Sequence, residues 1–306
     1  MPDIRPSSRA RVVALLALPL LACGNPAATK NEPRLVAIGA AVTETLFALG
    51  VGKDVVAVDR TSIFPMEAAA LPKVGLPGQL SVEGIAAQRP TLIIADAPPA
   101  ALALLESAGL AVARLAEAPS TVEGAAARIE AIGALVDRAA AAKALVASLR
   151  ADVAAVEAIV AKQTTRPRAL FVYARGPRTL LIAGSDTPAE AVLRMAGADN
   201  AVTGFSGMKP LSAEVVLAAR PEVIVIPTRG LDSLGGEDGL LAIPGIAETP
   251  AAKNRKVIAV DDGALLAFGP RLPEGLRALA HGLHPDLSPT APHPTQPTQP
   301  TQQTQP

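Results

Sequence analysis

The chain has 306 residues, of which 50% are hydrophobic and only 2% are aromatic. This length and apolar content predict about two domains packed with small aliphatic side chains, and they exclude a mainly disordered protein. The 28 basic and 28 acidic residues balance to a formal charge of zero, without a long basic stripe. Because nucleic-acid binding needs clustered cations or aromatic stacking platforms, we expect no nucleic-acid partner.

The amino terminus has the layout of an export signal. Three arginines precede an apolar stretch over residues 12–22, which is too short to span a bilayer. The stretch ends in Leu-Leu-Ala-Cys, which resembles the lipobox of bacterial lipoproteins. Because Cys23 is the only cysteine, no internal disulfide can form. We expect a signal peptide over residues 1–22, a lipid anchor at Cys23 and a periplasmic or cell-envelope location. A plain cleaved signal with a chance cysteine is the alternative.

After a linker over residues 23–33, apolar runs and amphipathic segments alternate over residues 34–120, as a parallel α/β lobe requires. The predicted strands cover 35–38, 55–58, 91–95 and 111–115, and the predicted helices cover 43–49, 81–88 and 100–108. Residues 121–165 then form an alanine-rich connection, whose periodicity predicts long helix with one break near Arg138.

A second alternating region covers residues 166–284. Its predicted strands cover 169–173, 179–183, 223–226 and 256–260, and its predicted helices cover 188–195, 212–219 and 272–283. The first two strands are predicted to form a hairpin. Residues 285–306 are mostly Pro, Thr and Gln and are expected to be a disordered tail. The predicted fold class is α/β, with two Rossmann-like lobes that each hold a mainly parallel sheet and are joined by a long backbone helix.

One pattern occurs twice, as LSVEGIAAQRPTLIIA over residues 80–95 and LSAEVVLAARPEVIVI over residues 211–226. Near the start of each copy is a serine suited to an N-cap, and two residues later Glu83 or Glu214 stands where a carboxylate favours the helix dipole. An Arg-Pro pair ends each helix, and the apolar run after it predicts a buried strand. The repeat predicts two similar lobes. On local physics alone, the two glutamates stabilise helix starts.

Together these features resemble the substrate-binding proteins of ABC importers for haem, cobalamin and ferric siderophores, over about residues 34–284. The resemblance implies a ligand cleft between the lobes and a partner permease dimer that docks on one acidic residue of each lobe. Glu83 and Glu214 match those two positions, and charge-assisted hydrogen bonds to permease arginines would orient the complex. The chain has no P-loop, so an ATPase partner would supply the energy. The implied protein is a monomer, held to the membrane only by its lipid.

Four segments are closest to the periplasmic haem-binding proteins of this class. These segments are residues 59–65, 71–75, 204–212 and 229–251. The resemblance implies haem as the transported ligand. It also implies that Arg229 lies near the iron ligand or a propionate, and a guanidinium can bind both oxygens of a carboxylate.

The sequence departs from that family at Phe64, which stands where the family has the tyrosine that ligates haem iron. A phenyl ring cannot coordinate iron, although Phe64 is still expected at the ligand site. Haem iron is held by His, Cys, Met or Tyr. Met66 and Met208 are candidates as a pair across the cleft, and Tyr173, at the end of a predicted strand, is a third candidate. The alternatives are that the cleft takes cobalamin, a ferric siderophore or another tetrapyrrole, or that the protein is a scaffold without a ligand.

The three histidines, His281, His284 and His293, fall in the last predicted helix and the tail. We expect them to be solvent-exposed, and their spacing does not favour a metal site. Since no histidine occurs earlier and no Gly-x-Ser-x-Gly elbow is present, the chain offers no evident base or nucleophile. We therefore expect a binding protein and not an enzyme.

Overall fold

The computed structural model describes residues 32–115 and 120–287. The predicted signal peptide, the Cys23 anchor, His293 and nearly all of the predicted tail lie outside the described residues.

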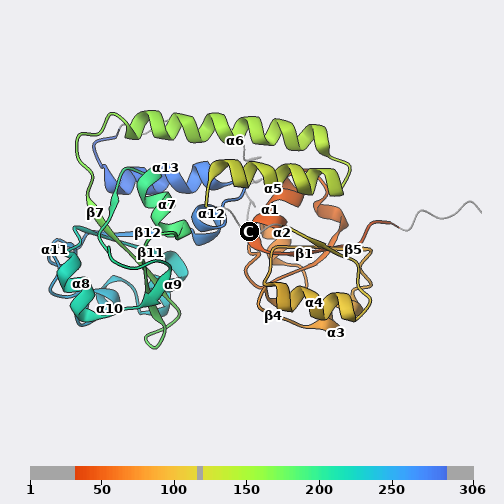
Figure 1. Ribbon diagram of the computed structural model, residues 1–306, viewed down its shortest axis with the longest axis horizontal. Coiled ribbons are helices and arrows are strands. Elements are labelled where there is room, and N and C mark those ends of the chain that lie inside the picture. Colours follow the sequence, from red (N-terminus) through yellow and green to blue (C-terminus); the bar gives the residue numbers. More distant parts are fainter. Residues whose placement is uncertain (1–31, 116–119, 288–306) are drawn as a thin grey trace, which may run out of the picture. The chain divides into compact units, whose positions relative to one another are not determined.

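The first lobe is built on a four-stranded, all-parallel sheet in the order β2-β1-β5-β6 (Figure 1). Its short apolar strands are mostly buried because helices cover the sheet. These strands are β1 Leu35–Ile38, β2 Val55–Val58, β5 Leu92–Ala95 and β6 Val112–Arg114. The remaining elements are α1 Ala40–Ala48, η1 Gly52–Asp54, α2 Met66–Ala69, β3 Gly75–Leu76, β4 Gln79–Leu80, α3 Val82–Ala87 and α4 Pro99–Ser107.

The connection consists of two helices, α5 Val122–Leu135 and α6 Ala139–Val160, which pack against each other. The helix breaks next to Arg138, as the sequence predicts. Along α6 the buried side chains recur every three or four residues and form one stripe. The stripe consists of Ala142, Val146, Leu149, Val153, Val156 and Val160. Among the described helices, none has both the length and the apolarity needed to cross a membrane.

The second lobe holds a mixed sheet in the order β10-β8-β7-β11-β12, with β9 also paired to β7. The β7–β8 pair is antiparallel, which confirms the predicted hairpin, and β11 is parallel to both β7 and β12. The strands are β7 Arg168–Ala174, β8 Leu180–Ala183, β9 Asp199–Asn200, β10 Met208–Pro210, β11 Val223–Pro227 and β12 Val257–Val260. The helices are α7 Pro188–Met195, α8 Ala213–Ala219, α9 Thr228–Ser233, α10 Glu237–Leu241, α11 Pro250–Lys253, α12 Asp262–Leu266 and α13 Leu272–Leu283.

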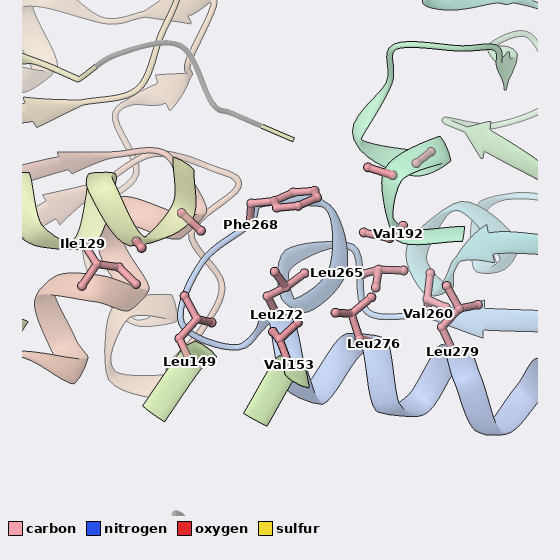
Figure 2. Packing of buried hydrophobic residues seen from close by; sticks show 14 of the residues in the cluster. Ile129, Leu149, Val153, Val192, Val260, Leu265, Phe268, Leu272, Leu276 and Leu279 are labelled. Carbon is pink, nitrogen blue, oxygen red and sulfur yellow. The ribbon is translucent and has the colours of Figure 1, made fainter. Parts of the chain in front are cut away.

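The largest hydrophobic core runs through the helices that join the lobes. Figure 1 shows α13 beside α6, and the two helices are in contact. In Figure 2, Leu149 and Val153 of α6 lie near Leu272 and Leu276 of α13. The expected backbone helix is therefore part of a packed layer that also includes α5 and α13. Such a layer resists the wide hinge motion that simple loop connections allow.

The two sequence repeats differ in how their helices start and agree in how they end. The Ser81 side chain accepts a hydrogen bond from the Gly84 amide at 3.0 Å, whereas Ser212 occupies the N-cap position without a side-chain cap. Arg89 and Arg220 both have left-handed backbone geometry, with φ of 47° and 45°. In both repeats the residue before the proline therefore ends the helix with left-handed backbone geometry, and not with the extended geometry that commonly precedes proline.

The expectation that the histidines are exposed is wrong for His284. This side chain is buried, and its Nε2 lies 3.2 Å from the carbonyl oxygen of Gly197. The reason is that the apolar face of α13 continues one residue beyond its last leucine, which carries the imidazole against the turn between α7 and β9.

Candidate ligand-binding site

A cavity of about 690 Å³ lies where the carboxyl ends of strands from both lobes meet. Parallel α/β sheets commonly bind ligands at these strand ends. Its wall in the first lobe includes Ala40, Ala41, Arg60, Thr61, Ile63, Leu76 and Asp96, and Arg128 comes from α5. Its wall in the second lobe includes Tyr173, Ala174, Arg175, Pro227, Arg229, Gly230, Ser233, Asp262, Gly263, Leu266 and Ala267.

The loop after β2 is held by the fully buried carboxylate of Asp59. Its oxygens accept hydrogen bonds from the backbone amides of Gly39 at 3.1 Å and Thr61 at 3.0 Å. They also accept from the hydroxyls of Thr61 and Ser62. These contacts fix the loop that places Arg60, Thr61 and Ile63 on the cavity wall. The sequence signal for this role is an Asp directly after a strand with Thr two residues later, which is a typical turn pattern.

Tyr173 and Arg175 project from the end of β7 and the turn after it. The Nε of Arg175 donates a hydrogen bond to the phenol oxygen of Tyr173 at 2.5 Å, and the guanidinium lies 5.5 Å from the ring centroid. The amide of Gly176 donates to the Ser233 hydroxyl at 2.9 Å, which in turn donates to the carbonyl of Gly230. This chain of bonds ties the hairpin to α9, the helix that carries Arg229.

Phe64 is adjacent to the cavity-lining residue Ile63, but it contacts a charged cluster instead. The Arg271 guanidinium carbon lies 3.9 Å from the centroid of the Phe64 ring. Arg271 also donates a hydrogen bond to Glu44 at 3.3 Å and forms ion pairs with Asp261 at 2.8 Å and Glu274 at 3.2 Å. Arginine stacked on an aromatic face is a favourable cation–π contact. Phe64 therefore joins the first lobe to the segment between α12 and α13.

Glu44 is the buried member of this cluster, and its side chain is only 3% exposed. Burial raises the pKa of Glu44 to about 8, and the negative charges of Asp261 and Glu274 add to the effect, while Arg271 opposes it. Its second carboxylate oxygen has no hydrogen-bond partner among the described residues. No sequence pattern indicated this pair, because Glu44 and Arg271 are separated by 227 residues.

The two methionine candidates lie elsewhere. Met66 begins α2 and is 72% exposed, and Met208 lies on the edge strand β10 and is 40% exposed. Among the described residues that line the cavity, neither methionine occurs. The structure thus brings Tyr173 and Arg229 together on one wall but does not bring Met66 and Met208 to it. No group of three or more His, Cys, Asp or Glu residues in the described ranges is arranged to hold a metal ion.

Arg128 is a cavity residue that sequence reasoning missed. It lies on α5, its side chain is only 4% exposed, and its Nη1 lies 3.2 Å from both Asp96 Oδ2 and the carbonyl oxygen of Ala267. Burial lowers the pKa of Arg128, and Asp96 opposes this effect. The available signal was a lone arginine between the buried positions Ala126 and Ile129 of an apolar helix face.

Glu83 and Glu214 occupy matching positions in the two lobes. Each lies in the first turn of its helix, α3 or α8, and each is exposed. The local helix-start interpretation and an interaction with a partner are both compatible with this placement.

Two α/β lobes with a ligand-sized cavity at their strand ends, joined by packed helices, define the class of bilobal binding proteins. Residues 35–264 match the Periplasmic binding protein family, and the chain belongs to that family. A curated relative, the uncharacterized ABC transporter substrate-binding lipoprotein YvrC of Bacillus subtilis (strain 168), is 28% identical over 84% of this chain and 82% of its own.

Two solved structures are more similar in sequence than this relative. The periplasmic heme-binding protein RhuT from Roseiflexus sp. RS-1, in apo form, is 36% identical, with a TM-score of 0.80 over 83% of this chain and 98% of that chain. The periplasmic heme-binding protein BhuT, in complex with two hemes, is 38% identical, with a TM-score of 0.75 over 82% of this chain and 98% of that chain.

Proposed function

We propose that this protein captures haem in the cavity between its lobes and delivers it to the permease of an ABC importer. Support comes from the family, from two solved heme-binding proteins at 36% and 38% identity, and from a relative named as an ABC transporter substrate-binding lipoprotein. A cavity of about 690 Å³ also falls within the range of about 300–1,000 Å³ that is typical of small-molecule sites. The protein would act as a carrier and not as an enzyme.

The observation that carries the proposal is the position of Tyr173. Of the side-chain types that hold haem iron, namely His, Cys, Met and Tyr, only Tyr173 occurs among the described residues that line the cavity. The positive guanidinium of Arg175, hydrogen-bonded to the phenol oxygen, compensates the negative charge of a phenolate that ligates iron. Arg60 on the first-lobe wall and Arg229 on the second-lobe wall of the same cavity suit carboxylates of the ligand.

The test is a haem titration of the chain from Gly24 onward, followed by Soret absorbance. We expect saturable binding with a phenolate-type spectrum. In Tyr173→Phe, which keeps the ring and removes the oxygen, this spectrum should disappear and affinity should fall by about tenfold or more, since even outer-shell partners of metal ligands contribute 10- to 100-fold.

The methionine variants Met66→Leu and Met208→Leu are the matched controls, and we expect their spectra to match the wild type. A Tyr173→Phe protein with an unchanged spectrum would show that another residue ligates the iron. A wild-type protein that produces no Soret change would contradict haem as the ligand, and cobalamin and ferric siderophores would then be titrated.

Delivery would depend on the two exposed glutamates. We assign Glu83 and Glu214 to docking on arginines of the permease dimer, one on each lobe, with the associated ATPase as the source of energy. Cys23, which lies outside the described residues, would carry the lipid that tethers the protein in the periplasm or cell envelope. The carrier would act as a monomer.

A further inference from the structure

One arginine of the cavity differs from the others. Arg60, Arg175 and Arg229 are exposed, so water solvates their charges. The Arg128 side chain is 4% exposed and still borders the cavity. A buried guanidinium has already lost its hydration in the unliganded protein, so an anion that reaches it gains more than an anion at a solvated arginine.

The hydrogen bonds of Arg128 leave one side of its guanidinium unused. Both contacts, to Asp96 and to Ala267, are made by Nη1, and each measures 3.2 Å, at the long end of the usual range. Nε and Nη2 are buried and have no hydrogen-bond partner among the described residues. Buried donors without partners are uncommon in proteins and call for an explanation.

The unused side of Arg128 is the one that binds carboxylates elsewhere in this protein. Arg114 donates from Nε and Nη2 to the two carboxylate oxygens of Glu106, and Arg150 donates from the same two atoms to Glu123. This fork geometry matches both oxygens of a carboxylate at once.

We infer that Arg128 forms an anion subsite at the inner wall of the cavity and binds an acidic group of the ligand, of the carboxylate class, through Nε and Nη2. The guanidinium is covered in the unliganded protein, so it must turn toward the cavity, exchanging its two long Nη1 contacts for the ligand. This inference rests on the proposed function, because it assigns a role toward the same ligand. It adds selectivity for a charged group that iron ligation by Tyr173 does not provide.

The test compares acids with their esters within each protein variant. Haem and protoporphyrin IX carry two carboxylates, and their dimethyl esters carry none, so the ratio of acid to ester affinity measures recognition of the carboxylates alone. Metal-free protoporphyrin IX, followed by fluorescence, makes the readout independent of iron ligation. Because each ratio is taken within one variant, partial loss of folded protein does not alter it.

We expect the wild type to prefer the acids, and Arg128→Met to lose about 10- to 100-fold of that preference, as removal of a hydrogen bond to a charged group does. Arg150→Met, which removes an exposed arginine that does not line the cavity, should retain the wild-type ratio. An equal ratio in wild type and Arg128→Met, with haem still bound, would overturn the anion subsite and leave the proposed function standing. If the wild type bound neither the acids nor the esters, the proposed function and the subsite would both be wrong.

Discussion

Replacement of Glu44 by Gln should change how the stability of this protein depends on pH. The carboxyl of Glu44, a residue of α1, is buried against Arg271, and the charged groups that act on it are Arg271, Asp261 and Glu274. Burial raises its pKa to about 8, from the usual glutamate value of about 4.5. Glutamine keeps the size and one oxygen acceptor for Arg271, but it cannot ionise.

The sign of the effect follows from proton linkage. Between about pH 4.5 and 8 the folded protein keeps a proton on Glu44 that the unfolded chain has released. The stabilisation from this raised pKa is therefore complete below about pH 4.5 and is lost as the pH rises toward 8. The expected slope is on the order of 1 kcal/mol per pH unit, which amounts to a few kcal/mol over the whole window.

The measurement is urea unfolding of the chain from Gly24 onward at pH 5, 6, 7 and 8. From pH 5 to pH 8 the free energy of unfolding of the wild type should decrease more steeply than that of Glu44→Gln, because only the wild type has the Glu44 proton to lose. Glu274→Gln is the matched control, because Glu274 also pairs with Arg271 but is 58% exposed, and the steeper decrease should persist there. If the wild type and Glu44→Gln show the same pH slope, the buried carboxyl is ionised throughout and the reasoning is wrong.

Two further predictions concern the loop after β2 and the delivery of the ligand to the permease. Asp59→Ala leaves the amides of Gly39 and Thr61 without their buried acceptor, so we expect a loss of about 2–4 kcal/mol in the free energy of unfolding, measured by urea denaturation. An unchanged midpoint would show that the loop is held by other contacts. Glu83→Ala combined with Glu214→Ala should abolish ligand uptake by cells while the Kd of the purified protein stays unchanged. Continued uptake would refute the docking role, and a raised Kd would indicate a structural effect instead.

Much of the secondary structure could be predicted from sequence because it depends on neighbouring residues. Pro at the first turn of α7 and Gly197 after its end delimit that helix, which begins and ends as predicted. The strands β1 and β2 also match their predicted bounds, since short apolar runs between turns favour buried strands. The burial of His284 has a local origin too, because this residue directly follows the last leucine of α13 and continues the apolar face of the helix.

The candidate site was only partly predictable. Tyr173 and Arg229 were identified from a strand end and a family motif, and both line the cavity. The roles of Asp59 and Arg128 depend on what lies beside them in space, and Arg128 meets its partner Ala267 across 139 residues of chain. That Tyr173 lines the cavity while Met66 and Met208 do not also depends on the positions of β7, α2 and β10.

By itself the sequence determined the α/β class and the repeated helix–turn–strand unit, because capping, proline geometry and apolar periodicity act over a few residues. Only the tertiary structure decided which charges are buried together. Glu44, Arg271 and Phe64 come from distant segments and meet beside the packed layer of α5, α6 and α13. Burial and charge pairing depend on the three-dimensional surroundings of each group, and no local pattern encodes them.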